Sequence, residues 1–458
     1  MFAYMKQKPG FYRQVVMLAL PIVLQNLITS ALGMADTFMV GMLGEVPMAA
    51  VTLANIPLFA LQMFIFGVQS GSSVLVSQYW GKQEMESINR VLGVALWVVL
   101  VVSALFAGVL LVCPVEFLSL FGNEPEVIAL AAQYGSIVGF SYVCNAFTMM
   151  YVAAYRSMER PQLGLYILVA SMATNTFLNW VLIFGKLGAP AMGVRGAATA
   201  TLIARLLEVT IVILHMMKNR FFRVHLHLLL RPGLDMTRRF LKYGGLVVCN
   251  ETMWGIGTSV FPTIMGHMAG STEILAAYTI AGNVEKITMV VAFGLASTAS
   301  IIIGREVGAG RADRILDVGK SLNTLAVMSG LTLGALLMLF VRLAAPAWVY
   351  PLFKLSPGAS SVATMMMTVM ALSMPLKDFN TVNIVGVLRG GGDVKAATLI
   401  DISPLWGVAI PYAALCGLVL KTTVLWVYLA FPLEQAVKFF IGIHRLRSGR
   451  WVRDLTRS

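Results

Sequence analysis

Charged residues are scarce in this sequence. Asp, Glu, Lys and Arg make up 12% of its 458 residues, whereas 58% are hydrophobic and the mean hydropathy is +0.81. Soluble domains carry about 25% charged residues, so the composition excludes an ordinary soluble protein and indicates a polytopic membrane protein. Cysteine is rare as well. The four cysteines stand singly with no CxxC pair, so nothing supports a zinc site.

The motifs of common enzymes are also missing. The sequence contains no H-E-x-x-H and no G-x-S-x-G. Gly319-Lys320-Ser321 resembles the end of a phosphate-binding loop, but Arg314 stands where the first glycine of that loop belongs. We therefore expect neither an enzyme nor an ATPase, and any transport would draw its energy from an ion gradient, with no cofactor.

Apolar segments fill most of the chain. Because about 20 apolar residues cross a bilayer as a helix, the sequence predicts twelve membrane-spanning helices. The first passes Asp36 without a small-residue cleavage site, so we expect it to remain as a span. The predicted ranges are 12–41, 47–79, 89–113, 126–155, 161–184, 192–217, 240–267, 273–304, 315–342, 358–388, 395–417 and 420–444.

The 34 Lys and Arg residues fall mainly in alternate connections and in a C-terminal tail that we start at Lys438. Arg389 is assigned to one of these basic connections. Cytoplasmic loops of membrane proteins are enriched in Lys and Arg, so both termini are predicted to be cytoplasmic, in a multi-pass protein of the inner (plasma) membrane. The net charge of +13 then reflects topology and predicts no nucleic-acid partner.

A long basic connection divides the twelve predicted helices into six and six. The predicted parts are an N-terminal six-helix bundle, a cytoplasmic linker, and a C-terminal six-helix bundle with a basic tail, at 1–217, 218–239 and 240–458. A weak repeat supports the division, because Gln78–Gly81 parallels Arg305–Gly308 and Ala154–Ser157 parallels Val387–Gly390. Six is an even number, so both repeats enter the membrane from one side. The predicted fold class is therefore an all-α polytopic membrane protein whose bundles are related by a pseudo-two-fold axis along the membrane normal.

Ionisable side chains inside membrane helices are costly and mark functional sites by default. Asp36, Glu251 and Asp378 are each the lone acid well inside a long apolar segment. Carboxylate and amide oxygens suit a hard cation, and a carboxyl group in a low-dielectric cavity can instead carry a proton. We expect these three acids to couple transport to Na⁺ or H⁺, with Na⁺ held at Glu251 and Asp378.

Other polar residues have a structural alternative. Arg205 and Glu208 stand three residues apart and are expected to pair, whereas Asp401 and Glu434 lie near helix ends or prolines and are expected to be hydrated caps. Amides can also simply hydrogen-bond between helices. The residues expected to line a cavity or contact substrate are Asn175, Asn179, Thr201, Asn250, Glu285, Lys286, Lys377, Asn380 and Asn383.

Lys377 is adjacent to Asp378. Its positive charge either keeps that carboxylate ionised, which favours a metal ion over a proton, or competes with the transported cation as an internal counter-ion. The sequence leaves both roles open.

Several stretches, in this order and spacing, resemble the multidrug and toxic compound extrusion (MATE) transporters along nearly the whole chain. They are Ala19–Asn26, Met34–Gly44, Gln78–Gly81, Asn175–Gly185, Gly193–Thr201, Asn250–Glu251 and Lys377–Asp393. The resemblance implies two six-helix bundles forming a V and cation-coupled export of organic, often cationic and amphipathic compounds.

The resemblance also implies residue roles. Asp36 corresponds to the family's acid in helix 1, and Glu251 and Asp378 correspond to the cation-site acids of helices 7 and 10. Asn175 matches the family's helix 5 asparagine, but Asn179 stands where many members have Asp. The first lobe is thus one carboxylate short, which favours the second lobe as the coupling site and slightly favours Na⁺ over H⁺.

The preferred interpretation is a secondary antiporter, functional as a monomer in the lipid bilayer, that exports a small organic substrate. The alternative is a flippase for a lipid-linked saccharide or related amphiphile. Such a flippase would need several basic residues in its cavity to hold a pyrophosphate, whereas acids are at least as prominent here as Arg205, Lys286 and Lys377.

Overall fold

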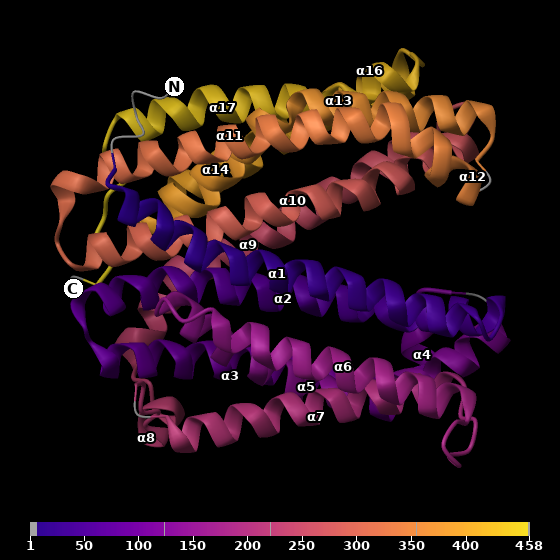
Figure 1. Cartoon of the computed structure of the whole chain (residues 1–458), viewed down its shortest axis with the longest axis horizontal. Coiled ribbons are helices and arrows are strands. Elements are labelled where there is room, and N and C mark those ends of the chain that lie inside the picture. Colours follow the sequence, from indigo (N-terminus) through magenta and orange to yellow (C-terminus); the bar gives the residue numbers. More distant parts are fainter. Residues whose placement is uncertain (1–6, 123, 220, 354, 457–458) are drawn as a thin grey trace. The chain divides into compact units, whose positions relative to one another are not determined.

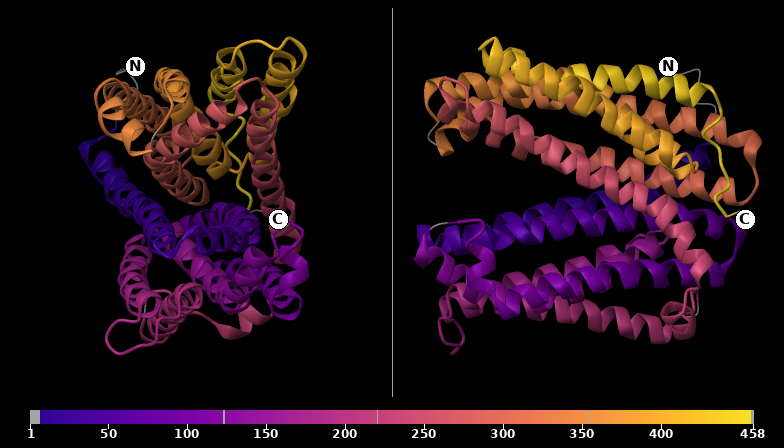
Figure 2. Two further views of the ribbon diagram at one scale, coloured as in Figure 1. Left: turned by 90° about the vertical axis from the view of Figure 1, so that its right-hand side faces the viewer. Right: turned by 180° about the vertical axis from the view of Figure 1, so that it is seen from behind.

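The computed structural model is helical throughout its described part (Figures 1 and 2). It describes residues 7–122, 124–219, 221–353 and 355–456, apart from the side chains of residues 34, 35, 37, 38, 45, 312 and 313. Part of the stretch Met34–Gly44, which carried the family resemblance, therefore lies outside the described side chains.

Twelve of the helices in the described residues have eleven residues or more. They are α1 (Pro9–Gly41), α2 (Glu45–Lys82), α3 (Met85–Val112), α5 (Pro125–Ser157), α6 (Gln162–Phe184), α7 (Val194–Lys218), α9 (Leu234–Gly266), α10 (Ser271–Gly308), α11 (Ala312–Ala344), α13 (Pro357–Thr381), α14 (Val394–Pro404) and α17 (Ala430–Arg447). The shorter ones are α4 (Pro114–Leu118), α8 (Leu226–Leu230), α12 (Tyr350–Leu352), α15 (Ile410–Ala414) and α16 (Val424–Tyr428). The π-helical segments are η2 (Ala345–Val349), η3 (Val382–Leu388), η4 (Leu405–Ala409) and η5 (Leu415–Val419).

Eleven helices in the described residues are long and apolar enough to cross a membrane. The twelfth predicted span is the segment 240–267. That segment forms a continuous helix, α9, but α9 is not among the eleven. Charged residues crowd its first turns, and Asn250 and Glu251 interrupt its apolar middle. Its polar groups therefore need partners from neighbouring helices.

The chain divides into two compact units. The N-unit is Leu24–Val248, and the C-unit combines Met1–Val23 with Cys249–Ser458. One boundary falls within α1 and the other within α9. The predicted boundaries at 217 and 239 come from counting six helices on each side of the linker. The two units are defined by contacts and do not test that division, so these boundaries stay a prediction.

In the N-unit, α3 holds the basic connection that follows α7. The buried Asn89 of α3 accepts a hydrogen bond from the His225 amide at 3.0 Å and donates to the Arg223 carbonyl at 3.2 Å. Further along the same helix, Arg90 donates to the Pro232 carbonyl at 3.2 Å. This stretch of the predicted linker is thus fixed to the N-unit by backbone hydrogen bonds.

In the C-unit, α11 and α13 approach closely around Pro375. A Cβ atom on Gly330 would lie 2.6 Å from the Pro375 Cα, and one on Gly334 would lie 2.5 Å from the Ala371 carbonyl oxygen. Proline has no N–H to continue the helical hydrogen bonds, and α13 passes into the π-helical η3 shortly afterwards. The segment that carries Asp378 therefore lies against α11 without intervening side chains.

The residues after α17 fold back onto the C-unit. Trp451 is fully buried in a hydrophobic cluster with residues of α1, α10, α11 and η3, and the Arg453 amide donates to the Gly391 carbonyl at 2.7 Å. Arg445 pairs with Asp393 at 2.6 Å. The predicted basic tail is therefore part helix and part packed segment.

Candidate functional site

The N-unit contains a chain of hydrogen bonds from α1 through α6 to α7. The Asn179 amide donates to Asp36 Oδ1 at 2.7 Å and to Asn175 Oδ1 at 3.1 Å. Asn175 in turn donates to Thr201 Oγ1 at 3.4 Å. Both asparagines are buried, since 3% of Asn175 and 1% of Asn179 is exposed. The structure thus joins four of the predicted site residues of the N-unit.

The series of hydrogen bonds in the N-unit ends at a single carboxylate, that of Asp36. Asp36 is half-buried, and the amide of Asn179, not a second acid, faces it. Arg205 pairs with Glu208 at 2.7 Å, as predicted from their spacing, and also acts electrostatically on Asp36. The N-unit site is therefore mostly neutral and built from amides and hydroxyls.

The C-unit site contains a fully buried arginine that the sequence analysis missed. Arg389 Nη1 lies 2.8 Å from Glu251 Oε1, and none of the arginine side chain is exposed. Arg389 follows the candidate span Pro357–Leu388, as predicted, but its burial and its pairing with an acid were not expected. The signal that could have found it is its place after a long apolar run, eleven residues beyond Asp378, where a buried guanidinium needs an acid from another helix.

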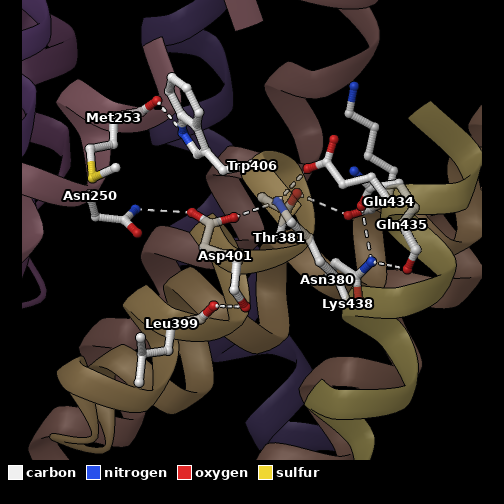
Figure 3. Close-up of polar contacts among 12 residues, drawn as sticks. Asn250, Met253, Asn380, Thr381, Leu399, Asp401, Trp406, Glu434, Gln435 and Lys438 are labelled. Atoms are coloured by element: carbon white, nitrogen blue, oxygen red, sulfur yellow. Dashed lines mark hydrogen bonds and ion pairs between the residues drawn. The ribbon is translucent and has the colours of Figure 1, made fainter. Parts of the chain in front are cut away.

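A second charged group surrounds Lys438 of α17 (Figure 3). Its Nζ lies 2.7 Å from Asp401 Oδ1 and 2.6 Å from Glu434 Oε1, and the Asn250 amide donates to Asp401 Oδ2 at 2.9 Å. Only 3% of Lys438 and 4% of Glu434 is exposed. Lys438 is thus a buried helix residue and not the start of an exposed tail. The expectation of a hydrated cap was therefore wrong for the buried Glu434, and Asp401, 15% of whose side chain is exposed, pairs with Lys438 and Asn250.

Asp378 has a different environment from Glu251. It is fully buried and accepts a hydrogen bond from Ser329 of α11 at 3.0 Å, while its Oδ1 has no hydrogen-bond partner in the described residues. Glu251 and Asp378 thus have separate partners in the structure. Their joint role at one cation site stays a prediction.

Amides from α11, α13 and η3 surround the same region. Asn323 of α11 donates to Asn383 Oδ1 at 3.2 Å, and Asn380 donates to the Gln435 carbonyl and side chain at 2.7 and 2.9 Å. The Oδ1 atoms of Asn323 and Asn380 are buried without partners in the described residues. These oxygens are of the type that binds a hard cation such as Na⁺. Asn323 and Ser329 were not predicted from the sequence.

The two lysines predicted to line a cavity, Lys377 and Lys286, differ in their surroundings. Lys377 pairs with Glu285 of α10, which brings two predicted residues together across helices. Lys286 is exposed. Lys377 therefore has a counter-ion of its own on α10 besides its sequence neighbour Asp378. Among the described residues, no group of three or more His, Cys, Asp and Glu side chains could hold a metal ion.

The chain is similar to known proteins over most of its length. A family model described as MatE matches residues 21–181 and 245–415. "Probable multidrug resistance protein NorM" of Thermotoga maritima is 23% identical over 452 residues, which cover 97% of this chain and 94% of that protein. "Uncharacterized transporter YisQ" of Bacillus subtilis is 24% identical over 439 residues, covering 94% and 93%.

Solved structures give a matching fold. A MOP superfamily transporter from Pyrococcus furiosus, described by its "reverse polarity of binding pocket", aligns with a TM-score of 0.85 at 18% identity and covers 99% of this chain and 98% of its own. An outward-facing multidrug resistance MATE family transporter aligns with a TM-score of 0.84 at 19% identity, covering 98% of each chain. At these identities the likeness shows the fold alone.

Proposed function

The chain belongs to the MatE family of membrane transporters, and from this premise we propose that it is a secondary active antiporter exporting organic, often cationic and amphipathic compounds in exchange for Na⁺ or H⁺. The observation that carries the proposal is Asp378, a fully buried carboxylate with one oxygen unpartnered in the described residues. The names of the NorM relatives, multidrug resistance proteins, support drug-like compounds as the substrate class.

A buried, half-satisfied carboxylate is suited to exchange a cation. Ionised and alone, it would cost several kcal/mol in the membrane interior, about 3 kcal/mol on insertion scales. A cation or proton that binds from outside removes this cost. Its binding favours the conformation in which the carboxylate and its neighbours bind it most tightly. We propose that this conformation is outward-open and that the substrate is released from it. Glu251 with Arg389, and Asp36 in the N-unit, would adjust the affinity.

The proposed architecture is two six-helix bundles related by a pseudo-two-fold axis along the membrane normal, with both termini cytoplasmic in the plasma membrane. The protomer is proposed to function as a monomer. The internal repeat and the basic connections of one side support this arrangement.

The flippase alternative has less support. Three of the interior cations of the described residues each pair with an acid: Arg205 with Glu208, Lys377 with Glu285, and Arg389 with Glu251. A pyrophosphate would have to displace those carboxylates to reach the bases. The pairs therefore favour cationic over polyanionic substrates.

The test is transport of a fluorescent cationic dye by the full chain in vesicles, driven first by a Na⁺ gradient alone and then by a pH gradient alone. We expect one gradient to drive transport and Asp378→Asn to abolish the response. Asp317→Asn is the matched control, because that side chain is 68% exposed on α11. Gradient-driven transport by Asp378→Asn equal to that of the wild type would rule out the assignment.

A further inference from the structure

Lys377 differs from the other paired cations in the interior of the C-unit, because the acid that it holds is the most exposed one. Its partner Glu285, on α10, has 37% of its side chain exposed, and Lys377 itself has 23%. The acids held by Arg389 and Lys438 are covered more completely, with at most 15% of any side chain exposed. Among these acids, Glu285 is therefore the one that a cation in the surrounding space reaches most easily.

Glu285 lies well inside the candidate membrane span Ser271–Gly308. Asn283 and Lys286 beside it are exposed. A Cβ atom on Gly282, one turn earlier, would meet no atom of the described residues within 4 Å. Charged groups inside a membrane face protein or water-filled space rather than lipid. This polar stretch of α10 therefore marks a surface that is open to a charged ligand at membrane depth.

Lys377 has other acids near it besides Glu285. Its ammonium also interacts electrostatically with Asp378 and with Glu434, which is shared with Lys438. Asp378 is fully buried, and its Oδ1 has no hydrogen-bond partner in the described residues. Displacing a cation from a buried pair is normally costly, because a charge is left uncompensated. Here the displaced ammonium remains beside a carboxylate, so another cation can take Glu285 at a smaller cost.

From this geometry we propose that Glu285 binds the positive charge of the exported compound and that Lys377 is a tethered competitor for the same carboxylate. Without substrate, the Lys377 ammonium occupies Glu285. When an organic cation binds there, the ammonium turns on its flexible side chain toward Asp378. The proposal rests on the proposed export of cationic compounds and assigns the acid that recognises their charge.

This competition would link substrate binding to the coupling ion. An ammonium beside Asp378 supplies the positive charge that the ion would otherwise supply, so Asp378 binds the ion less tightly while substrate occupies Glu285. By reciprocity, an ion bound at Asp378 returns Lys377 to Glu285 and weakens substrate binding by the same factor. The exchange of substrate for ion would then follow from one ammonium that pairs with two acids in turn.

The experiment is equilibrium binding of ethidium, a dye with a permanent positive charge, to the purified full chain in lipid nanodiscs, followed by fluorescence anisotropy. Lys377→Met removes the competitor, so the dissociation constant should fall about tenfold, a usual size for coupling between two sites. Glu285→Gln removes the acid and should raise the dissociation constant. Lys320→Met is the matched control, because it also removes a lysine paired with an acid, but at an exposed position of α11, and the dissociation constant should not change.

Further probes separate the charge of Lys377 from its bulk. Lys377→Arg keeps the positive charge and should retain the weaker ethidium binding of the wild type. Nile red, an uncharged dye, should bind to the wild type and to Lys377→Met with the same affinity. If Lys377→Met does not fold, Lys377→Gln takes its place with the same expectations.

The proposal would be overturned if removing the lysine charge left the dissociation constant of ethidium unchanged, raised it or abolished binding. An equal fall with Lys320→Met, an equal gain for Nile red, or no change with Glu285→Gln would overturn it as well. Equilibrium binding needs no gradient, so it tests the pair of Lys377 and Glu285 even if Asp378→Asn shows in vesicles that coupling lies elsewhere. Failure of the proposed function and failure of this proposal are therefore distinguishable.

Discussion

The two units satisfy their buried polar groups in different ways, although the N-unit also contains the ion pair of Arg205 with Glu208. The N-unit joins Asp36 to Thr201 through two asparagines, so a single carboxylate ends a chain of neutral hydrogen bonds. The C-unit instead has ion pairs, with Arg389 on Glu251, Lys438 on two acids and Lys377 on Glu285. Neutral bonds contribute about 1 kcal/mol each, whereas breaking a buried ion pair costs about 3–5 kcal/mol. Substitutions in the ion pairs of the C-unit should therefore lower the free energy of unfolding more than substitutions in the hydrogen-bonded chain of the N-unit.

The largest effect is expected for Lys438→Met. The substitution leaves the buried Glu434 and the half-buried Asp401 without their shared ammonium, and we expect the free energy of unfolding to fall by about 5 kcal/mol. Chemical unfolding of the wild type and the variant in detergent measures this loss of stability. Lys320→Met is the control, because its pair with Asp317 is exposed and contributes less than about 1 kcal/mol. Equal losses for the two variants would contradict the buried pairing.

Arg389→Met is expected to cost about 3 kcal/mol, because it strands Glu251 in the interior. The double variant Arg389→Met/Glu251→Gln should recover most of this loss, since no unpaired charge is then left. The same unfolding measurement on the four members of this cycle tests the pair. A double variant as unstable as the single one would show that packing around Arg389, and not charge, dominates.

Gly330→Ala tests the close approach of α11 to Pro375. A Cβ atom there would lie 2.6 Å from the Pro375 Cα, so the backbone of α13 must shift, at an expected cost of about 2 kcal/mol. Gly282→Ala is the matched control: it lies within α10 with nothing within 4 Å, and it should be neutral or stabilising. Because Asp378 lies beyond Pro375 on α13, Gly330→Ala should also weaken gradient-driven transport.

Much of the fold followed from the sequence, because the length of apolar segments is a strong signal in membrane proteins. Eleven of the twelve predicted spans correspond to helices of sufficient hydropathy, and the spacing of Arg205 and Glu208 predicted their pairing. The amide chain of the N-unit could be anticipated only in part. Asn175 and Asn179 share a face by spacing, but nothing local indicated that Asp36 lies opposite them.

Most of the charged network of the C-unit could not be predicted from the sequence, because its partners come from different helices. Arg389 and Lys438 follow apolar runs and precede basic residues, so locally they read as cytoplasmic charges. Glu251 is 138 residues from Arg389 and Asp401 is 37 residues from Lys438, so only tertiary packing brings these pairs together. Glu434 lies four residues from Lys438, and spacing alone could have predicted that pair. Residue type shows that a buried charge needs a partner, but not which helix supplies it.

The N-unit could be converted toward the charged design of the C-unit by Asn179→Asp. The new carboxylate would take the place of an amide that lies 2.7 Å from Asp36. Two carboxylates at that distance cannot both be ionised at little cost, so the pair should share a proton. We expect only a small change in stability but a new dependence of dye transport on external pH, measured in vesicles without a Na⁺ gradient. An unchanged pH profile would show that Asp36 is not accessible to the transported ion.

The smallest effect is expected where the N-unit chain is weakest. The bond from Asn175 to Thr201 is 3.4 Å long, and Thr201 also donates to the Ala197 carbonyl of its own helix. Thr201→Val keeps the shape and removes a hydroxyl that also hydrogen-bonds with Tyr134 of α5, so the unfolding free energy should fall by about 1 kcal/mol, the net contribution of a neutral hydrogen bond. Asn179→Leu should cost more, because it removes the bonds to both Asp36 and Asn175. If Thr201→Val were as damaging as Arg389→Met, the N-unit chain would have to be a charged network too, and the contrast between the units would fail.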